Sequence, residues 1–367
     1  MDFSSSRSPQ AVSLSPYMTR LNETSARPSG PQAHTSLALL LLLPLTFIAC
    51  PGSSTPDANV QQASAPVAAA PAAPASPASS ASPVTARPAF DGERAFAHVS
   101  KMVALGPRPA GSAELARTRQ YIIGELQAYG LKVTTDEFTA KTPQGDKKMV
   151  NVTAELPGQS PDAIIIGSHY DTKPYKTFRF VGANDAGSST GALLELARAL
   201  KGEKPRLTYW FVFFDGEEAF CPGWDDCSKP DAPDNTYGSR RYVAHLKEQN
   251  QLARVRAMIL LDMMGYKNLQ LQRDDMGTRW IEDVIWGAAR DIGHGDVFVE
   301  GAEGVGGDDH EPFLKAGIEA VDIIQLNGYP YWHTAEDTLD KISPRSLQVV
   351  GETLVASLPR LEQRLQK

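Results

Sequence analysis

The sequence lacks a basic face, a long apolar run and an internal repeat, and the first two absences restrict its partners. The formal net charge at pH 7 is −7, and the Lys and Arg residues form no cluster. Binding to nucleic-acid phosphates needs such a cluster, so we expect no nucleic-acid partner. The apolar run at residues 37–49 has only thirteen residues, which is too short to span a bilayer comfortably.

Cysteine is also scarce, with three residues in the whole chain. Only Cys221 and Cys227 lie beyond the N-terminal region, and their spacing matches no familiar zinc motif. In an oxidising compartment, two cysteines six residues apart in one loop can form a local disulfide. We therefore predict a disulfide between them, with a cysteine-bound metal as the less favoured alternative.

Residues 1–49 have the organisation of an export signal. Arg20 and Arg27 precede the apolar run, which ends in Phe47, Ile48 and the small residue Ala49 directly before Cys50. This order predicts a lipid-modified cysteine at Cys50, like that of bacterial lipoproteins, in a periplasmic or cell-envelope protein that reaches the membrane only through this anchor. The alternative is simple signal cleavage. Because the region before the run is long, a translation start at Met18 would give a more ordinary signal.

The composition then changes twice along the chain. Ala, Pro and Ser dominate residues 50–89, and such a segment cannot bury enough apolar area to offset the entropy of ordering. We predict a linker there. From Phe90 onward apolar residues recur with regular spacing, which predicts one folded domain over residues 90–367.

Short apolar strands alternate with amphipathic helices through this domain. The predicted strands cover residues 131–138, 149–156, 163–167, 207–214, 255–261 and 320–325. The predicted helices are one that ends before Gly106, followed by residues 115–129, 191–200, 237–249, 280–291 and 344–365. This alternation predicts an α/β fold in which helices flank both faces of a mixed, mostly parallel central sheet.

Several loops carry acidic or histidine side chains, and two of them directly follow apolar strands. His169 follows one predicted strand, Asp185 lies in a Gly-rich loop, and Glu217 and Glu218 follow another strand. Ligands of open α/β sheets bind beyond the carboxyl ends of the strands, and zinc takes His nitrogens and carboxylate oxygens. The pattern predicts one metal site at this edge, to which His333 contributes from late in the chain.

Each of these residues also has a simpler interpretation. An Asp in a Gly-rich loop is by itself more often a turn or helix-capping residue, which applies to Asp185. Glu217 and Glu218 could lie in a solvated acidic loop, but the apolar strand before them favours a buried position. Adjacent side chains point in different directions, so one carboxylate can bind metal while its neighbour transfers protons. Asp262 and Asp308 extend the same acidic pattern.

Four segments together resemble the animal-type glutaminyl-peptide cyclotransferases, within the wider family of zinc-dependent M28 aminopeptidases. They are residues 167–173, 213–220, 237–240 and 332–334. The resemblance runs from about Phe90 to the C-terminus, and any one segment alone would be weak. It implies the zinc aminopeptidase fold and an enzyme that converts the N-terminal Gln of peptides or proteins to pyroglutamate, with release of ammonia.

The cyclase resemblance also implies roles for particular residues. One zinc would be held by Asp185, Glu218 and His333. The implied catalytic group consists of Glu217, which transfers the proton, and Asp262 and Asp308, which support it by hydrogen bonds. The substrate side chain would lie between two aromatic walls, Trp224 and Trp332.

The second interpretation is a metallo-aminopeptidase of the same family that uses two zincs. Its ligands would be His169, Asp185, Glu218, Asp262 and His333, with Asp185 bridging. Glu217 would then activate a water molecule for attack on the first peptide bond. All these ligands are present, so ligand identity does not separate the two enzymes.

The residues around the ligands favour the cyclase, in particular Trp224, Trp332 and the doubled acid before His310. Two features oppose it: residues 262–266 are more similar to those of the peptidases, and Asp322 stands where the animal cyclases carry a His. The segment between the two central cysteines also interrupts the spacing before Trp224. A third interpretation, a lipoprotein that keeps the fold as a non-catalytic binding module, is disfavoured because Glu217 is intact.

Overall fold

The computed structural model describes residues 89–366. The export signal over residues 1–49, lipid attachment at Cys50 and nearly all of the linker over residues 50–89 lie outside the described residues and stay predictions. No helix within residues 89–366 has the length and apolar character needed to cross a membrane.

A six-stranded mixed sheet forms the centre of the described domain. Its spatial order is β1 (Lys132–Thr142), β2 (Gly145–Leu156), β4 (Leu207–Phe214), β3 (Ser160–His169), β5 (Val255–Leu261) and β8 (Ala320–Ile323). β1 pairs antiparallel with β2, and β2 pairs antiparallel with β4. The pairs β4–β3, β3–β5 and β5–β8 are parallel. The predicted α/β class is confirmed, with the parallel strands grouped on one side of the sheet.

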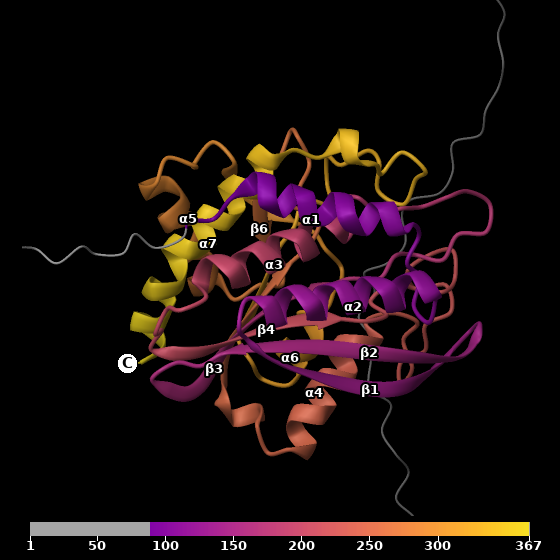
Figure 1. Cartoon of the computed structure of the whole chain (residues 1–367), viewed down its shortest axis with the longest axis horizontal. Coiled ribbons are helices and arrows are strands. Elements are labelled where there is room, and N and C mark those ends of the chain that lie inside the picture. The colour runs from indigo at the N-terminus through magenta and orange to yellow at the C-terminus, as the bar shows by residue number, and fades with distance from the viewer. Residues whose placement is uncertain (1–88, 367) are drawn as a thin grey trace, which may run out of the picture. The chain divides into compact units, whose positions relative to one another are not determined.

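Helices cover both faces of this sheet (Figure 1). One face packs against α1 (Gly92–Leu105), α2 (Ala113–Ala128), α3 (Gly187–Leu200), α5 (Arg279–Asp291) and α7 (Pro344–Leu365). The other packs against α4 (Tyr237–Glu248) and α6 (Glu311–Lys315). The short helical turns η1 (Leu252–Arg254) and η2 (Leu339–Lys341) join the larger elements.

Strand β4 shows why an apolar run predicts this arrangement. Successive side chains of a strand point to opposite faces. Phe211 and Phe213 enter the larger apolar core, whereas Trp210, Val212 and Phe214 enter the core beneath α4 and α6. All eight residues of the strand are buried. A strand covered on both sides needs apolar residues at every position, so continuous rather than alternating hydrophobicity marks it.

Helix α7 matches the predicted residues 344–365, and its first turn shows why. Ser343 precedes it, and the Ser343 side chain accepts a hydrogen bond from the Ser346 N–H. Pro344 then occupies the first turn, where its missing N–H has no intrahelical partner to lose. These capping signals are local, so they are legible in the sequence.

Two features differ from the predicted strands. β1 and β2 extend further as a hairpin that turns at Gly145, where φ is +87°, because their outer ends are polar and gave no apolar signal. A second sheet, formed by β6 (Leu271–Asp274) and β7 (Phe298–Glu303), was not predicted. Its strands are short and mix buried with exposed residues, so neither carries a clear period.

Candidate active site

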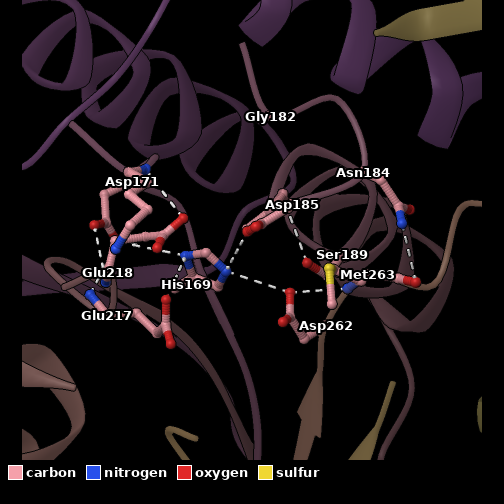
Figure 2. A network of polar contacts seen from close by, with 12 residues as sticks. His169, Asp171, Gly182, Asn184, Asp185, Ser189, Glu217, Glu218, Asp262 and Met263 are labelled. Atoms are coloured by element: carbon pink, nitrogen blue, oxygen red, sulfur yellow. Dashed lines mark hydrogen bonds and ion pairs between the residues drawn. The ribbon is translucent and has the colours of Figure 1, made fainter. Parts of the chain in front are cut away.

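The acidic and histidine side chains meet at the carboxyl ends of three neighbouring strands. His169 is the last residue of β3, Asp185 lies just before α3, and Asp262 directly follows β5. Glu217 and Glu218 lie a few residues beyond β4. Figure 2 shows His169 between the Asp185 and Asp262 carboxylates on one side and the Glu217 segment on the other. Adjacent strands thus bring together residues that are almost one hundred positions apart in the chain.

Asp185, Glu218 and His333 form one group with the geometry of a metal site, since one ligand atom of each lies within 4.8 Å of the others. His333 Nε2 is 3.3 Å from Asp185 Oδ2 and 3.2 Å from Glu218 Oε2. Glu218 Oε2 is buried and has no hydrogen-bond partner among the described residues. A buried carboxylate oxygen without a partner is costly, and a cation would satisfy it. The residues therefore fit a zinc ion.

A second group shares Asp185 with the first. It contains His169, Asp185 and Asp262, again with ligand atoms within 4.8 Å of one another. His169 Nε2 is 3.3 Å from Asp185 Oδ1 and 3.3 Å from Asp262 Oδ1. The two oxygens of Asp185 thus face two different histidines. This is the arrangement that a bridging carboxylate between two metal ions would have, so the structure accommodates both ligand sets.

Burial and charge shift the pKa values of this centre. Burial lowers the pKa of His333, but the Glu218 and Asp185 carboxylates raise it to about 9. Burial would raise the pKa of Asp185, yet hydrogen bonds from His169 and His333 bring it below its ordinary value. Burial raises the pKa of Asp262 to about 7. The centre gathers more negative charge than its histidines balance, which favours a divalent cation.

Glu217 lies beside both groups without belonging to either. Its side chain is buried, and Oε2 is 3.7 Å from His169 Nδ1. Burial raises the pKa of Glu217 well above its ordinary value, with a further contribution from the negative charge of Asp308. A carboxylate that is free of ligand contacts and holds a proton readily has the properties of a proton-transfer residue.

Asp262 and Asp308 were expected to support Glu217 by hydrogen bonds, and the structure places them differently. Asp262 Oδ1 accepts the Met263 N–H and lies near His169, so Asp262 belongs to the second ligand group. Asp308 acts on Glu217 through its charge, and no hydrogen bond joins their side chains within the described residues. His310 lies 3.1 Å from Asp274 Oδ2 and belongs to neither ligand group.

A pocket of about 210 Å³ opens over the first group. Its lining includes the predicted residues Asp185, Glu217, Glu218, Trp224, Asp262, Asp308, Trp332 and His333. His169 is not part of the lining. The Trp332 ring stacks on His333, with centroids 4.2 Å apart. The pocket therefore combines one ligand group, several further carboxylates that include Glu217, and two large aromatic rings.

The predicted disulfide is confirmed, since Cys221 and Cys227 are bonded. This bond closes the loop that carries Trp224. It excludes the alternative of a metal bound by these two thiolates. The segment that interrupts the sequence spacing therefore forms a closed loop that returns Trp224 to the pocket.

Three further buried residues hold the site in place. None of them received a role from the sequence. Asp171 accepts the backbone N–H groups of Glu217 (3.1 Å) and Glu218 (3.4 Å). Asp337 accepts those of Asn184 (2.8 Å) and Asp185 (3.1 Å). Such residues orient metal ligands without touching the metal.

The third of these buried residues is Arg108, whose guanidinium donates to the carbonyl oxygens of Val181 (2.8 Å) and Gly182 (3.1 Å), just before the Asp185 loop. In the sequence, Arg108 lies in a Gly-Pro-Arg-Pro segment that indicated only the end of a helix. Asp337 lies four residues after His333, and this proximity was the one signal available for it.

Comparisons with known proteins agree with this site. The sequence model of Peptidase family M28 matches residues 151–358. The glutaminyl-peptide cyclotransferase of Bos taurus is 26% identical over 297 residues, covering 67% of this chain and 76% of the relative. Crystal structures of an Acidobacteriales bacterium glutaminyl cyclase (35% identity, TM-score 0.71) and of a Zn-dependent exopeptidase from Parabacteroides distasonis (28% identity, TM-score 0.68) are similar. They cover 78% and 74% of this chain, and 100% and 99% of their own. The chain belongs to peptidase family M28.

Proposed function

We propose that the protein is a zinc-dependent glutaminyl-peptide cyclotransferase, which converts the N-terminal Gln of peptides or proteins to pyroglutamate and ammonia. The observation that carries this proposal is the pocket, in which a free buried carboxylate, Glu217, lies beside one ligand group and two tryptophans. The chain is also similar to a bacterial glutaminyl cyclase over the full length of that protein, which supports the same activity.

We place one zinc at Asp185, Glu218 and His333. All three line the pocket, whereas the second group is only partly exposed to it, through Asp185 and Asp262 but not through His169. A substrate carbonyl in the pocket would therefore have access to the first group. Zinc bound there supplies a Lewis acid for the γ-carbonyl oxygen of the substrate glutamine.

Glu217 performs the proton transfer in this account. The α-amine nitrogen of the substrate bonds to the carbonyl carbon of its own side-chain amide (Cδ) and gives a proton to the Glu217 carboxylate. The bond between that carbon and the amide nitrogen then breaks, and Glu217 returns the proton so that ammonia leaves. One proton is taken and one is given back, so Glu217 ends in its starting state.

The remaining work is positioning. Because amine and carbonyl belong to one residue, correct orientation alone provides a high effective molarity. Trp224 and Trp332 would hold the glutamine side chain in the ring-forming conformation and exclude water that would otherwise compete with the amine. This division of roles needs no external nucleophile.

A two-zinc aminopeptidase is the second candidate, and a specific observation favours it. The two oxygens of Asp185 face His333 and His169 separately, as a bridging ligand would. In that enzyme Glu217 would activate water for hydrolysis of the first peptide bond.

A product assay tests the proposal. The purified protein is offered glutamine amide and leucine amide in equal amounts, and ammonia, pyroglutamate amide and free leucine are quantified. The cyclase forms pyroglutamate amide and releases no leucine. Release of leucine without ring closure would reverse the order of the two candidates.

We also propose that the chain is exported and anchored to the membrane through a lipid on Cys50. The order of charged, apolar and small residues before Cys50 supports this. Incorporation of a radiolabelled fatty acid in a bacterial host is expected for the natural sequence and not for Cys50→Ser. Equal labelling of both would contradict the anchor.

A further inference from the structure

A second hollow adjoins the active-site pocket. Its volume is about 550 Å³, compared with about 210 Å³ for the pocket. Four residues line both spaces: Trp224, Asp225, Gly306 and Gly307. The two spaces are therefore neighbours across a shared wall, and a chain that leaves the pocket on this side enters the second hollow.

Two of the four shared residues are glycines, so this part of the wall carries no side chains. Gly306 and Gly307 have φ values of +75° and +124°, which other residues rarely adopt. A Cβ atom at Gly306 would meet no atom within 4 Å, so that position faces open space. Backbone without side chains is what allows another chain to approach closely.

The other two shared residues lie in a loop that is held in place at its ends. The disulfide between Cys221 and Cys227 closes the loop that carries Trp224 and Asp225. Asp234 accepts the Cys221 N–H at 2.9 Å and fixes the start of this loop. A hollow with a fixed wall and an open glycine side is preformed, which reduces the entropy cost of binding an extended ligand.

The charges differ between the two spaces. The pocket is lined by acidic residues, whereas the lining found only in the second hollow contains three cations, Lys229, Arg240 and Lys315, and one carboxylate, Glu311. Lys315 pairs with Glu311 at 2.7 Å. Lys229 is exposed and its side chain has no partner within residues 89–366. With the shared Asp225 counted, three cations face two carboxylates, so the second hollow keeps an excess of positive charge in a protein whose net charge is negative.

Arg240 has a structural part in this surface. Its guanidinium donates to the carbonyl oxygens of Pro233 (2.9 Å) and Asn235 (2.8 Å) and lies 4.9 Å from the centre of the Tyr237 ring. It is therefore fixed in place and adds its charge without being free to move. Lys229 and Lys315 are the two cations whose replacement leaves the loops intact.

We propose that this second hollow, the downstream groove, binds the residues that follow the N-terminal glutamine of a peptide substrate and favours acidic side chains there. The inference rests on the proposed function, because it takes the pocket as the site of the glutamine. The two spaces share four lining residues, so the residues that directly follow the glutamine in an extended chain would enter the second hollow. Opposite charges in partly solvated surroundings then contribute modestly but selectively.

The test compares three amidated substrates: glutamine amide, Gln-Ala-Glu-Glu and Gln-Ala-Lys-Lys. We expect kcat/KM for the acidic peptide to exceed that for the basic peptide by about threefold to tenfold, mainly through KM. In Lys229→Glu and in the double variant with Lys315→Glu, this preference should shrink or reverse, while turnover of glutamine amide stays unchanged. High salt should reduce the preference in the natural protein.

Lys101→Glu is the matched control. Lys101 is exposed on α1 and lines neither space, so this variant, which changes the net charge as much as Lys229→Glu does, should leave the preference unaltered. Equal kcat/KM for both peptides, or an undiminished preference in the double variant, would overturn the downstream groove. A change of equal size in Lys101→Glu would also overturn it, because the effect would then come from net charge.

Failure of the proposed function gives a different result. If glutamine amide gives no pyroglutamate amide and leucine amide is hydrolysed instead, the cyclase proposal fails. The peptides Leu-Ala-Glu-Glu and Leu-Ala-Lys-Lys, both amidated, then replace the glutaminyl pair and the same comparison decides for or against the downstream groove.

Discussion

The carboxylate of Asp337 accepts the backbone N–H of Asp185 at 3.1 Å. The same carboxylate accepts the Asn184 N–H and the Tyr329 hydroxyl, the latter at 2.6 Å. Asp337 is fully buried, so these three donors fix its position. The relationship makes the orientation of a proposed zinc ligand depend on a residue from the far end of the chain.

The first prediction concerns Asp337. Asp337→Asn keeps the shape but replaces one acceptor oxygen by a donor, so one backbone N–H loses its partner. We expect zinc affinity to fall by about tenfold to one-hundredfold, because residues that orient metal ligands have effects of this size. Competition with a chelator measures it. Asp340→Asn, at an exposed position in the same region, is the control and should bind zinc normally. Unchanged affinity in Asp337→Asn would show that Asp185 holds its position unaided.

The second prediction separates the two adjacent glutamates. Glu217→Gln should lower kcat by about 10²-fold to 10⁴-fold and leave the zinc content unchanged, because Glu217 transfers the proton and binds no metal. Glu218→Gln should lose zinc instead. Metal analysis and turnover of glutamine amide measure both. Loss of zinc from the Glu217 variant would contradict the role of Glu217 as a proton-transfer residue that binds no metal.

A third prediction concerns the loop that carries Trp224. Replacing Cys221 and Cys227 by Ser together removes the constraint on this loop. For so short a loop the expected loss of stability is about 2 kcal/mol. Because Trp224 lines the pocket, KM for glutamine amide should rise several-fold with little change in kcat. Thermal unfolding and steady-state kinetics measure the two effects. An unaltered KM would show that Trp224 is positioned independently of the disulfide.

The fourth prediction is a pH dependence of stability at Glu282 on α5. The side chain is buried, and neither carboxylate oxygen has a hydrogen-bond partner within the described residues. Burial raises its pKa to about 7, although the positive charges of Arg273 and Arg279 oppose this and Asp274 adds to it. The protonated form is therefore favoured in the folded state. Its contribution to stability is fully present below the ordinary pKa of a Glu and is lost as pH rises through about 7.

Glu282→Gln tests this dependence, because glutamine mimics the protonated acid at every pH. At pH 8 the variant should be more stable than the natural protein, by up to about 3 kcal/mol. Near pH 4 the two should have similar stability. Denaturant unfolding at both pH values measures the difference. A variant that is less stable at pH 8 would show that the ionised form is the one the fold favours.

Elements of the fold were predicted correctly where neighbouring residues in the sequence carry the information. The buried central strands and α7 were predicted because continuous apolar runs and capping residues are read from neighbouring positions. The β6–β7 sheet was not, since its strands are short and mix buried with exposed residues. Such strands show neither a continuous apolar run nor a clear period.

The same distinction applies to the site. His169, Asp185, Glu218 and Asp262 were predicted as a cluster because each stands at or near a strand or helix end, and parallel strands share one edge. Arg108, in contrast, contributes through hydrogen bonds to backbone carbonyls more than seventy positions away. Its sequence context indicates only a helix end, so its contribution is visible only in three dimensions.

The most direct test is a crystal structure of the zinc-loaded protein with anomalous diffraction measured on both sides of the zinc absorption edge. The account predicts one strong peak, at about 2.0–2.2 Å from ligand atoms of Asp185, Glu218 and His333, with the Glu217 carboxylate unbound. A second peak of equal strength beside His169 and Asp262 would contradict the single-zinc cyclase and favour the two-zinc aminopeptidase. The absence of any peak between Asp185, Glu218 and His333 would contradict the metal site itself.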